Sequence, residues 1–193
     1  PIADAFMDST PMVILTGQVG SHLLGTDAFQ ETDFTGITIP ITKHSYLVTD
    51  AAELPRVFRE AFYLASSGRR GPVVIDVTKD AQQARVIPDW EPEMELPGYA
   101  PRADGESRSI AQAARLLTNA QRPLIMAGNG VIMSGAHGAL LALAERTGTP
   151  VVTTLHGLGA FPEDHALALG MPGMHGWVHA NRAIQECDVL VNV

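Results

Sequence analysis

Short apolar runs alternate with helical patterns along most of this chain. Between the runs, apolar residues recur every three or four positions, as they do from Leu54 to Ala65, which indicates helices that bury one face. Strand, helix, strand in this order favours parallel strands joined by right-handed crossovers. We therefore predict an α/β fold of doubly wound parallel sheets. The predicted strands are Pro11–Leu15, Tyr46–Val48, Val73–Val77, Pro123–Ala127, Pro150–Thr154 and Asp188–Val193.

The alternation stops between Ile87 and Glu106. Prolines stand at positions 88, 92, 97 and 101, and almost no periodicity remains. Such a composition is typical of a semi-rigid linker between domains. We predict one α/β piece over 1–86, a proline-rich linker over 87–106 and a second piece over 107–193. The first helix of the second piece is expected to bury a stripe of Ile110, Ala113, Ala114 and Leu117.

Charge and composition exclude several classes of function. The net charge is −8 and the 13 Lys and Arg residues are scattered, which argues against a nucleic-acid partner. No apolar run is long enough to span a bilayer, so no membrane association is expected. The single cysteine, Cys187, rules out an internal disulfide and fits a reducing compartment, so we expect a cytoplasmic protein.

The two ends of the sequence suggest a piece of a longer protein. The first residue is Pro1 rather than Met, and Pro1–Met7 lacks the pattern of a signal peptide. The last apolar run, Asp188–Val193, has no loop after it. We therefore expect an internal fragment.

A glycine-rich stretch from Thr16 to Glu31 follows the first predicted strand. Open α/β sheets bind ligands at the carboxyl ends of their strands, and the glycines allow close approach to a ligand. Asp27 to Gln30 are expected to begin a helix whose free amides point into the same crevice. On these residues alone, a strand-to-helix turn without chemistry remains the simpler interpretation.

A second candidate site follows the strand at Pro123–Ala127. Gly128-x-Gly130 between a strand and a helix is a geometry that holds phosphate. Met133 stands where the NAD fingerprint requires a small residue, and no acidic residue ends the next strand, so that fingerprint is incomplete. A dinucleotide held in another pose by Gly128, Gly130 and Thr154 remains open.

The histidines give weak support for a metal. His175 and His179 are four residues apart and His165 lies upstream, but no third ligand is evident and the H-E-x-x-H pattern is absent. We predict no metal site among these residues. The sequence also lacks a P-loop, a Cys-x-x-Cys pair and a Ser-His-Asp order.

Six strings, in the same order along the chain, resemble those of one enzyme family. The strings are Thr16–Glu31, Ile41–Val48, Ser67–Asp80, Leu96–Tyr99, Thr154–Gly159 and Gly173–Gly176. They are similar to the large catalytic subunit of acetolactate (acetohydroxyacid) synthase, a thiamine-diphosphate enzyme that also carries FAD. The resemblance spans nearly the whole chain.

The resemblance implies a domain plan and an activity. Residues 1–86 would be the end of a pyrimidine-binding domain, and 107–193 the start of a Rossmann-like central FAD-binding domain. The parent enzyme would condense two pyruvates, or pyruvate and 2-oxobutyrate, with release of CO₂ in branched-chain amino acid biosynthesis. Its cofactors would be thiamine diphosphate, Mg²⁺ and FAD. It would be a homodimer or tetramer, with a regulatory small subunit as a further partner.

The same resemblance implies which residues serve the site. Phe29, Gln30 and Lys79 would lie near the substrate access path and the thiamine cofactor, usually across a subunit boundary. Gly20 departs from the many relatives that have proline there. The glutamate that activates thiamine and the Mg²⁺ site would lie outside these residues, so the isolated fragment is expected to be inactive. Contacts with FAD are implied for Arg69, Gly128, Gly130, Thr154, Leu155, Met174, His175 and Gly176.

Three alternatives stay open at this point. Glyoxylate carboligase and pyruvate oxidase share the domain plan, and the oxidase uses its flavin in redox chemistry. A non-catalytic nucleotide-binding module is the third alternative.

Overall fold

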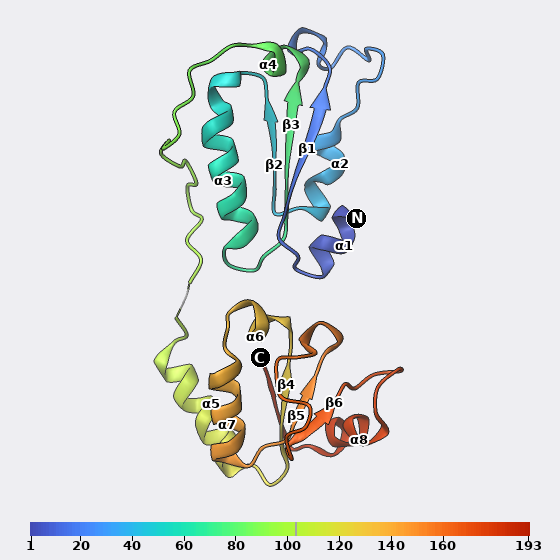
Figure 1. Ribbon diagram of the computed structural model, residues 1–193, viewed down its shortest axis with the longest axis vertical. Helices are drawn as coiled ribbons and strands as arrows, with labels where there is room; N and C mark the ends of the chain where they lie inside the picture. The colour runs from blue at the N-terminus through green and yellow to red at the C-terminus, as the bar shows by residue number, and fades with distance from the viewer. Residues whose placement is uncertain (103) are drawn as a thin grey trace. The chain divides into compact units, whose positions relative to one another are not determined.

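The computed structural model describes residues 1–102 and 104–193 (Figure 1). They form two compact units, unit 1 over Pro1–Asp104 and unit 2 over Gly105–Val193. Every strand pair in each unit is parallel, and helices alternate with the strands. The predicted parallel-sheet α/β fold is therefore confirmed.

In unit 1 the described strands pair in the order β1-β3-β2. Figure 1 shows α3 on one side of this sheet and α1 and α2 on the other. The elements are α1 (Ile2–Met7), β1 (Met12–Gln18), the 3-10 turn η1 (Ser21–Leu23), α2 (Phe34–Thr38), η2 (Ile39–Ile41), β2 (His44–Val48), η3 (Ala51–Glu53), α3 (Leu54–Ser66), β3 (Pro72–Thr78) and α4 (Lys79–Gln83).

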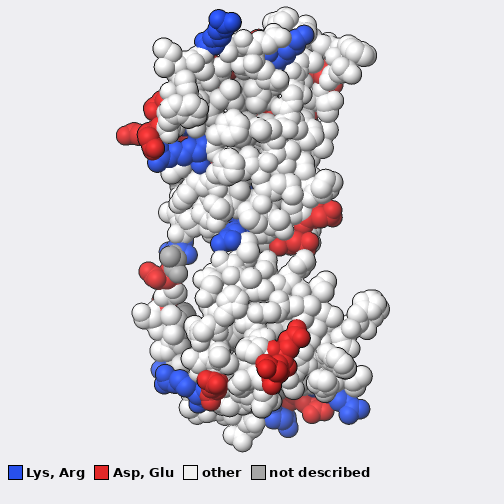
Figure 2. Space-filling view, viewed as in Figure 1, with Lys and Arg blue, Asp and Glu red and all other residues white. Residues whose placement is uncertain are grey.

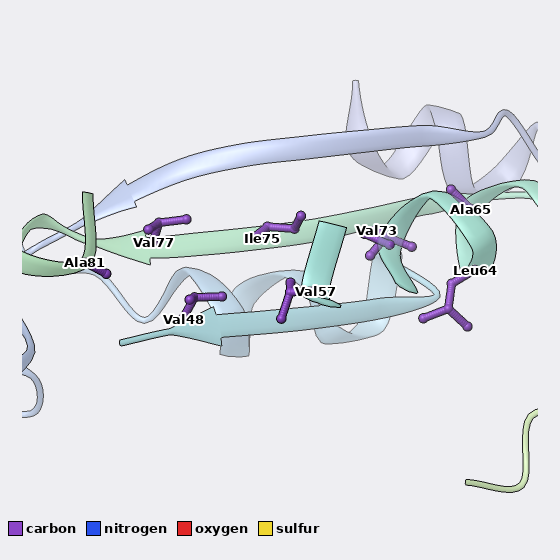
Figure 3. Packing of buried hydrophobic residues seen from close by; sticks show 9 residues of the cluster. Val48, Val57, Leu64, Ala65, Val73, Ile75, Val77 and Ala81 are labelled. Carbon is purple, nitrogen blue, oxygen red and sulfur yellow. The ribbon is translucent and has the colours of Figure 1, made fainter. Parts of the chain in front are cut away.

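The core of unit 1 lies between α3 and the sheet (Figure 3). The central strand β3 is buried along its whole length, as expected for a parallel strand with both faces covered. Alternate residues of β3 meet the apolar stripe of α3. The buried members of this cluster are Val48, Val57, Ala61, Leu64, Ala65, Val73, Ile75, Val77 and Ala81.

The helix predicted to begin between Asp27 and Gln30 begins later, at Phe34, so that prediction is wrong. Asp27 and Gln30 have φ angles of 57° and 66°, which no right-handed helix accommodates. Asp33 caps α2 instead, because its side chain accepts a hydrogen bond of 2.8 Å from the amide of Gly36.

The proline-rich stretch lies against unit 1 for most of its length. Leu96 and Tyr99 pack on the core cluster beside α3. Arg59 of α3 donates a hydrogen bond of 2.9 Å to the carbonyl of Pro92. Position 103, within the predicted linker, lies outside the described residues.

Unit 2 has the strand order β6-β5-β4-β7 among its described residues. The chain passes from β4 to β5 on one side and returns to place β7 on the other side of β4. Such a reversal is the point at which open α/β sheets bind their ligands. The elements are α5 (Ser107–Asn119), β4 (Pro123–Ala127), α6 (Asn129–Met133), α7 (His137–Thr147), β5 (Val151–Thr153), η4 (Leu155–Gly157), β6 (Ala168–Gly170), α8 (Val178–Glu186) and β7 (Val189–Asn192).

Both faces of the second sheet carry apolar clusters. One cluster joins β4 and β5 to α6 and α7, and the other joins them to α8. The helix α5 differs, because none of its residues is buried and Ile110 is 58% exposed. The expectation that its stripe is an inner one is wrong here, because α5 packs beside the edge strand β7 and its stripe stays exposed.

Candidate functional site

In unit 1 the glycine-rich loop and Lys79 lie at the same edge of the sheet. Gln18, the last residue of β1, pairs in register with Thr78, the last residue of β3. Lys79 follows at once as the first residue of α4, and its amide donates to the carbonyl of Val19 at 3.4 Å. Parallel pairing therefore brings the loop after β1 and the residues after β3 together.

The loop presents two of the predicted residues side by side. Phe29 is 89% exposed, and Gln30 follows it in a left-handed backbone conformation. Lys79 is exposed at the same edge. The geometry offers a cation, an amide and an aromatic ring at one carboxyl edge, a set suited to binding a small carboxylate ligand.

In unit 2 the predicted glycines lie where the strand order reverses. The amide of Gly128 donates to the carbonyl of Val193 at 2.8 Å, and the amide of Thr154 donates to the carbonyl of Ala127 at 3.0 Å. These bonds join the ends of β4, β5 and β7. A Cβ placed on Gly130 would meet nothing within 4 Å, so the space beside it is open.

Thr154 and Leu155 begin the turn that crosses this edge. The hydroxyl of Thr154 accepts a hydrogen bond of 3.1 Å from the amide of Gly157 and so caps η4. Gly157 packs on the end of β4, where an added Cβ would lie 2.3 Å from the carbonyl oxygen of Ala127. Leu155 is 64% exposed.

The loop that carries Met174 and His175 follows β6 and is held in shape by α8. The amide of Gly173 donates to Oδ1 of Asn181 at 2.7 Å, and Nδ2 of Asn181 donates to the carbonyl of Gly173 at 2.9 Å. Met174 is 90% exposed and His175 is exposed beside it. At Gly176 an added Cβ would lie 2.2 Å from the carbonyl oxygen of Met171, so only glycine fits.

These features of unit 2 fit a flavin nucleotide. The switch point supplies main-chain groups and an open glycine, and the exposed apolar side chains of Leu155 and Met174 offer a surface for a flat ring. A cavity of about 440 Å³ lies at the base of the same loop, lined by Trp177, His179, Gly170 and Met171 among others.

Arg69 lies in unit 1, at the amino end of β3. It is exposed, and its Nε donates a hydrogen bond of 2.9 Å to the hydroxyl of Ser9. Lys79 stands at the other end of the same strand. Arg69 and Lys79 therefore lie at opposite ends of β3.

The histidines considered as metal ligands have other contacts. Nδ1 of His165 accepts a hydrogen bond from the amide of Leu167 at 3.2 Å, and its ring meets Phe161 edge to face. The ring of His179 stacks on Trp177 with centroids 5.8 Å apart. Over residues 1–102 and 104–193, no three His, Cys, Asp or Glu side chains gather as a metal site.

The surface carries its charges in small groups. On the face seen in Figure 2, Lys and Arg are dispersed and most of the surface is uncharged. Among the described helices, none has the length and apolar character needed to cross a membrane.

The sequence reasoning missed the acidic residues that hold the loop of unit 1. The carboxylate of Asp80 binds the amide and hydroxyl of Ser21, at 2.8 and 2.6 Å. Glu31 binds three amides of its own loop. For Glu31 the only local signal was an acidic residue shortly after the turn at Gly25. For Asp80 there was no local signal, because its partner Ser21 lies 59 residues away.

Comparisons with known proteins agree with this fold. Residues 110–193 match the family described as the central domain of thiamine pyrophosphate enzymes. A solved thiamin diphosphate-dependent enzyme from Mycobacterium smegmatis superposes with a TM-score of 0.75 and 26% identity, covering 99% of this chain and 36% of that one. Residues 110–193 therefore match the central domain of this enzyme class, and the superposition extends the similarity to 99% of the chain.

Within that class the chain is homologous, along its whole length, to acetolactate synthases. It is 53% identical over 193 residues to the acetolactate synthase large subunit of Corynebacterium glutamicum, covering 100% of this chain and 31% of that protein. Identity is 52% to acetolactate synthase of Mycobacterium leprae, with 99% and 31% covered, and 49% to acetolactate synthase 2 of Zea mays, a chloroplastic protein, with 98% and 30% covered. The chain thus spans about a third of the length of the curated relatives that it matches.

Proposed function

We propose that this chain is part of an acetolactate synthase that condenses two pyruvates to 2-acetolactate with release of CO₂, or pyruvate with 2-oxobutyrate. The observation that carries the proposal is the 53% identity with an acetolactate synthase large subunit over all 193 residues. The alternatives, glyoxylate carboligase, pyruvate oxidase and a non-catalytic module, lack such a match among the relatives reported above.

Two sites would serve this reaction. The switch point of unit 2, with Gly128, Gly130, Thr154 and the loop around His175, would hold FAD as a structural group. For Arg69 a role as an FAD contact stays a prediction, because a guanidinium suits phosphate and carbonyl oxygens. The further FAD contacts proposed are Leu155, Met174 and Gly176.

The edge of the unit 1 sheet at which β1 and β3 end would face the substrate. Thiamine diphosphate, bound with Mg²⁺ by residues outside this chain, would supply the nucleophilic carbon. Lys79 would attract the carboxylate of the 2-oxo acid, and the amide of Gln30 would donate a hydrogen bond to it. The ring of Phe29 would exclude water from the access path.

The domain plan and the partners belong to the same proposal. Residues 1–86 would complete a pyrimidine-binding domain, 87–106 would connect it, and 107–193 would begin the central domain. A homodimer or tetramer, a regulatory small subunit and a cytoplasmic location stay predictions.

The test is an assay of the longer protein that contains this segment. Pyruvate with thiamine diphosphate, Mg²⁺ and FAD should yield acetolactate, detected as acetoin after acid treatment, without oxygen consumption. Oxygen uptake with peroxide formation would favour pyruvate oxidase, and activity restricted to glyoxylate would favour the carboligase. The 193-residue chain alone should quench FAD fluorescence on binding and release no CO₂ from pyruvate.

A further inference from the structure

The loop between β1 and α2, residues 19–33, is closed at its base by one side chain. Nε2 of Gln18 donates to the carbonyl of Thr32 at 2.7 Å, and its Oε1 accepts from the amide of Val19 at 2.9 Å. Gln18 is held in turn by the buried carboxylate of Asp76, which accepts from Nε2 at 3.0 Å. Both ends of the loop are therefore fixed to the sheet.

A second tie joins the loop to the residue beside Lys79. Asp80 accepts two hydrogen bonds from Ser21. Together they hold the pKa of the Asp80 carboxyl well below its usual range, and the bond from the hydroxyl has the larger effect. The start of the loop and the start of α4 consequently keep a fixed relation.

A third tie lies inside the loop, at its tip. The carboxylate of Glu31 accepts hydrogen bonds from the amides of Gly25, Thr26 at 3.2 Å and Ala28 at 3.1 Å. The bond from Gly25 is the main cause of a pKa of Glu31 below its usual value, against a smaller opposing effect of desolvation. Converging amides of this kind form an anion-binding nest, and here the chain fills the nest with its own carboxylate.

The backbone that Glu31 organises is strained and presents an apolar ring to solvent. Asp27 and Gln30 adopt positive φ without being glycine, a conformation that costs on the order of 1 kcal/mol per residue and persists only where the surroundings enforce it. Phe29 lies between them and is 89% exposed. Strain combined with an exposed aromatic side chain on a fixed loop indicates preorganisation for a ligand.

We propose that Glu31 is a positioning residue, whose carboxylate, by binding the amides of Gly25, Thr26 and Ala28, sets the orientation of Phe29 and Gln30 toward the 2-oxo acid. The inference rests on the proposed function. Glu31 acts only through its neighbours, since its carboxylate is already engaged by three amides.

The experiment compares Glu31→Gln with wild type in the longer protein. The neutral amide keeps the size of the side chain but places an NH₂ group against backbone donors, so the tip of the loop should loosen. We expect kcat/KM for pyruvate to fall on the order of 10- to 100-fold, chiefly through KM, because small misplacements of binding groups have effects of this size. Amide hydrogen exchange over residues 25–30 should rise while the melting temperature stays within about 2 °C.

Two further variants separate positioning from general stability. Glu53→Gln changes a carboxylate that pairs with Arg56 at 3.4 Å, away from the loop, and should leave kcat/KM and loop exchange unchanged. In a Phe29→Ala/Gln30→Ala background, Glu31→Gln should have almost no additional kinetic effect, because the residues it orients are gone. Glu31→Asp keeps the charge on a shorter side chain and should show an intermediate loss.

The outcomes separate the proposed function from the positioning role of Glu31. Wild-type protein that forms no acetolactate would refute the proposed function before any variant is compared. An active enzyme in which Glu31→Gln loosens the loop but leaves kcat/KM unchanged would refute the positioning role alone. An equal kinetic loss in the double-alanine background would also refute it, since Glu31 would then act by another route.

Discussion

The carboxylate of Glu60, in α3, accepts a hydrogen bond of 2.7 Å from the backbone amide of Glu95, 35 residues later in the chain. Glu60 is 1% exposed, and it also accepts hydrogen bonds from the hydroxyl of Tyr46 at 2.9 Å and from Arg56 at 3.1 Å. A buried carboxylate thus fixes the proline-rich stretch to α3 of unit 1.

Replacing this carboxylate should destabilise unit 1. In Glu60→Gln the new NH₂ group faces donors rather than acceptors, and Arg56 loses its buried partner. We expect the free energy of unfolding to fall by about 2–4 kcal/mol. Urea unfolding followed by circular dichroism measures this change. The control is Glu53→Gln, an exposed carboxylate directly before the same helix, for which a change of about 0.5 kcal/mol or less is expected. Equal losses in the two variants would contradict this account.

The same carboxylate should give a defined pH dependence. Burial alone raises the pKa of Glu60, but the amide of Glu95, Tyr46 and Arg56 outweigh burial, and the net pKa lies below the usual value of 4.5. As pH falls, Glu60 therefore binds a proton at a higher pH in the unfolded chain than in the folded protein. The stabilisation is complete above about pH 4.5 and is lost as pH falls through the lower folded-state pKa. Unfolding measured from about pH 6 to pH 3 should show a shallower loss in Glu60→Gln than in wild type.

Gly157 and Gly130 should respond in opposite directions to alanine. At Gly157 the new methyl group would lie 2.3 Å from the carbonyl oxygen of Ala127, a backbone atom that cannot rotate away. We expect a loss of about 1–3 kcal/mol. At Gly130, within α6, nothing lies within 4 Å, and alanine should stabilise by up to about 1 kcal/mol. Thermal unfolding of both variants checks the contrast, which similar shifts would refute.

Gly20→Pro should stabilise unit 1. Gly20 has φ −58° and ψ 145°, values that proline adopts, and its amide donates none of the hydrogen bonds found among the described residues. The nearest obstacle to a Cβ is the imidazole of His22 at 2.9 Å, a side chain free to rotate. We expect a gain of about 0.4–1 kcal/mol from reduced freedom of the unfolded chain. A lower melting temperature in Gly20→Pro would show that the loop resists the substitution.

The sequence predicted most of the secondary structure because its signals are local. The run Val73–Val77 is the centre of β3. In the predicted stripe of α3, Val57, Ala61 and Ala65 are buried, whereas Phe62 is 62% exposed. The helix α5 was predicted from the same kind of periodicity, but no neighbouring element buries its apolar stripe. Periodicity fixes which residues share a face, whereas covering that face requires a neighbour that the periodicity does not specify.

The sequence also predicted that candidate site residues following neighbouring strands lie at one edge of the sheet. Gly128 and Thr154 follow β4 and β5, which are parallel and paired, so their meeting at one edge follows from the alternation of strands and helices. The same reasoning brought Lys79 to the edge that carries Gln30.

By itself, then, the sequence determined the alternation of elements, the parallel sheets and, for each sheet, the edge at which its glycine-rich loop lies. Only the tertiary structure decided that Glu31 binds loop amides where a helix was expected to begin, that Asp80 holds Ser21 across 59 residues, and that Glu60 binds the amide of Glu95. The physical reason is that hydrophobic periodicity is encoded between neighbours along the chain. The partner of a polar group instead depends on which distant segments the finished fold places within hydrogen-bond distance.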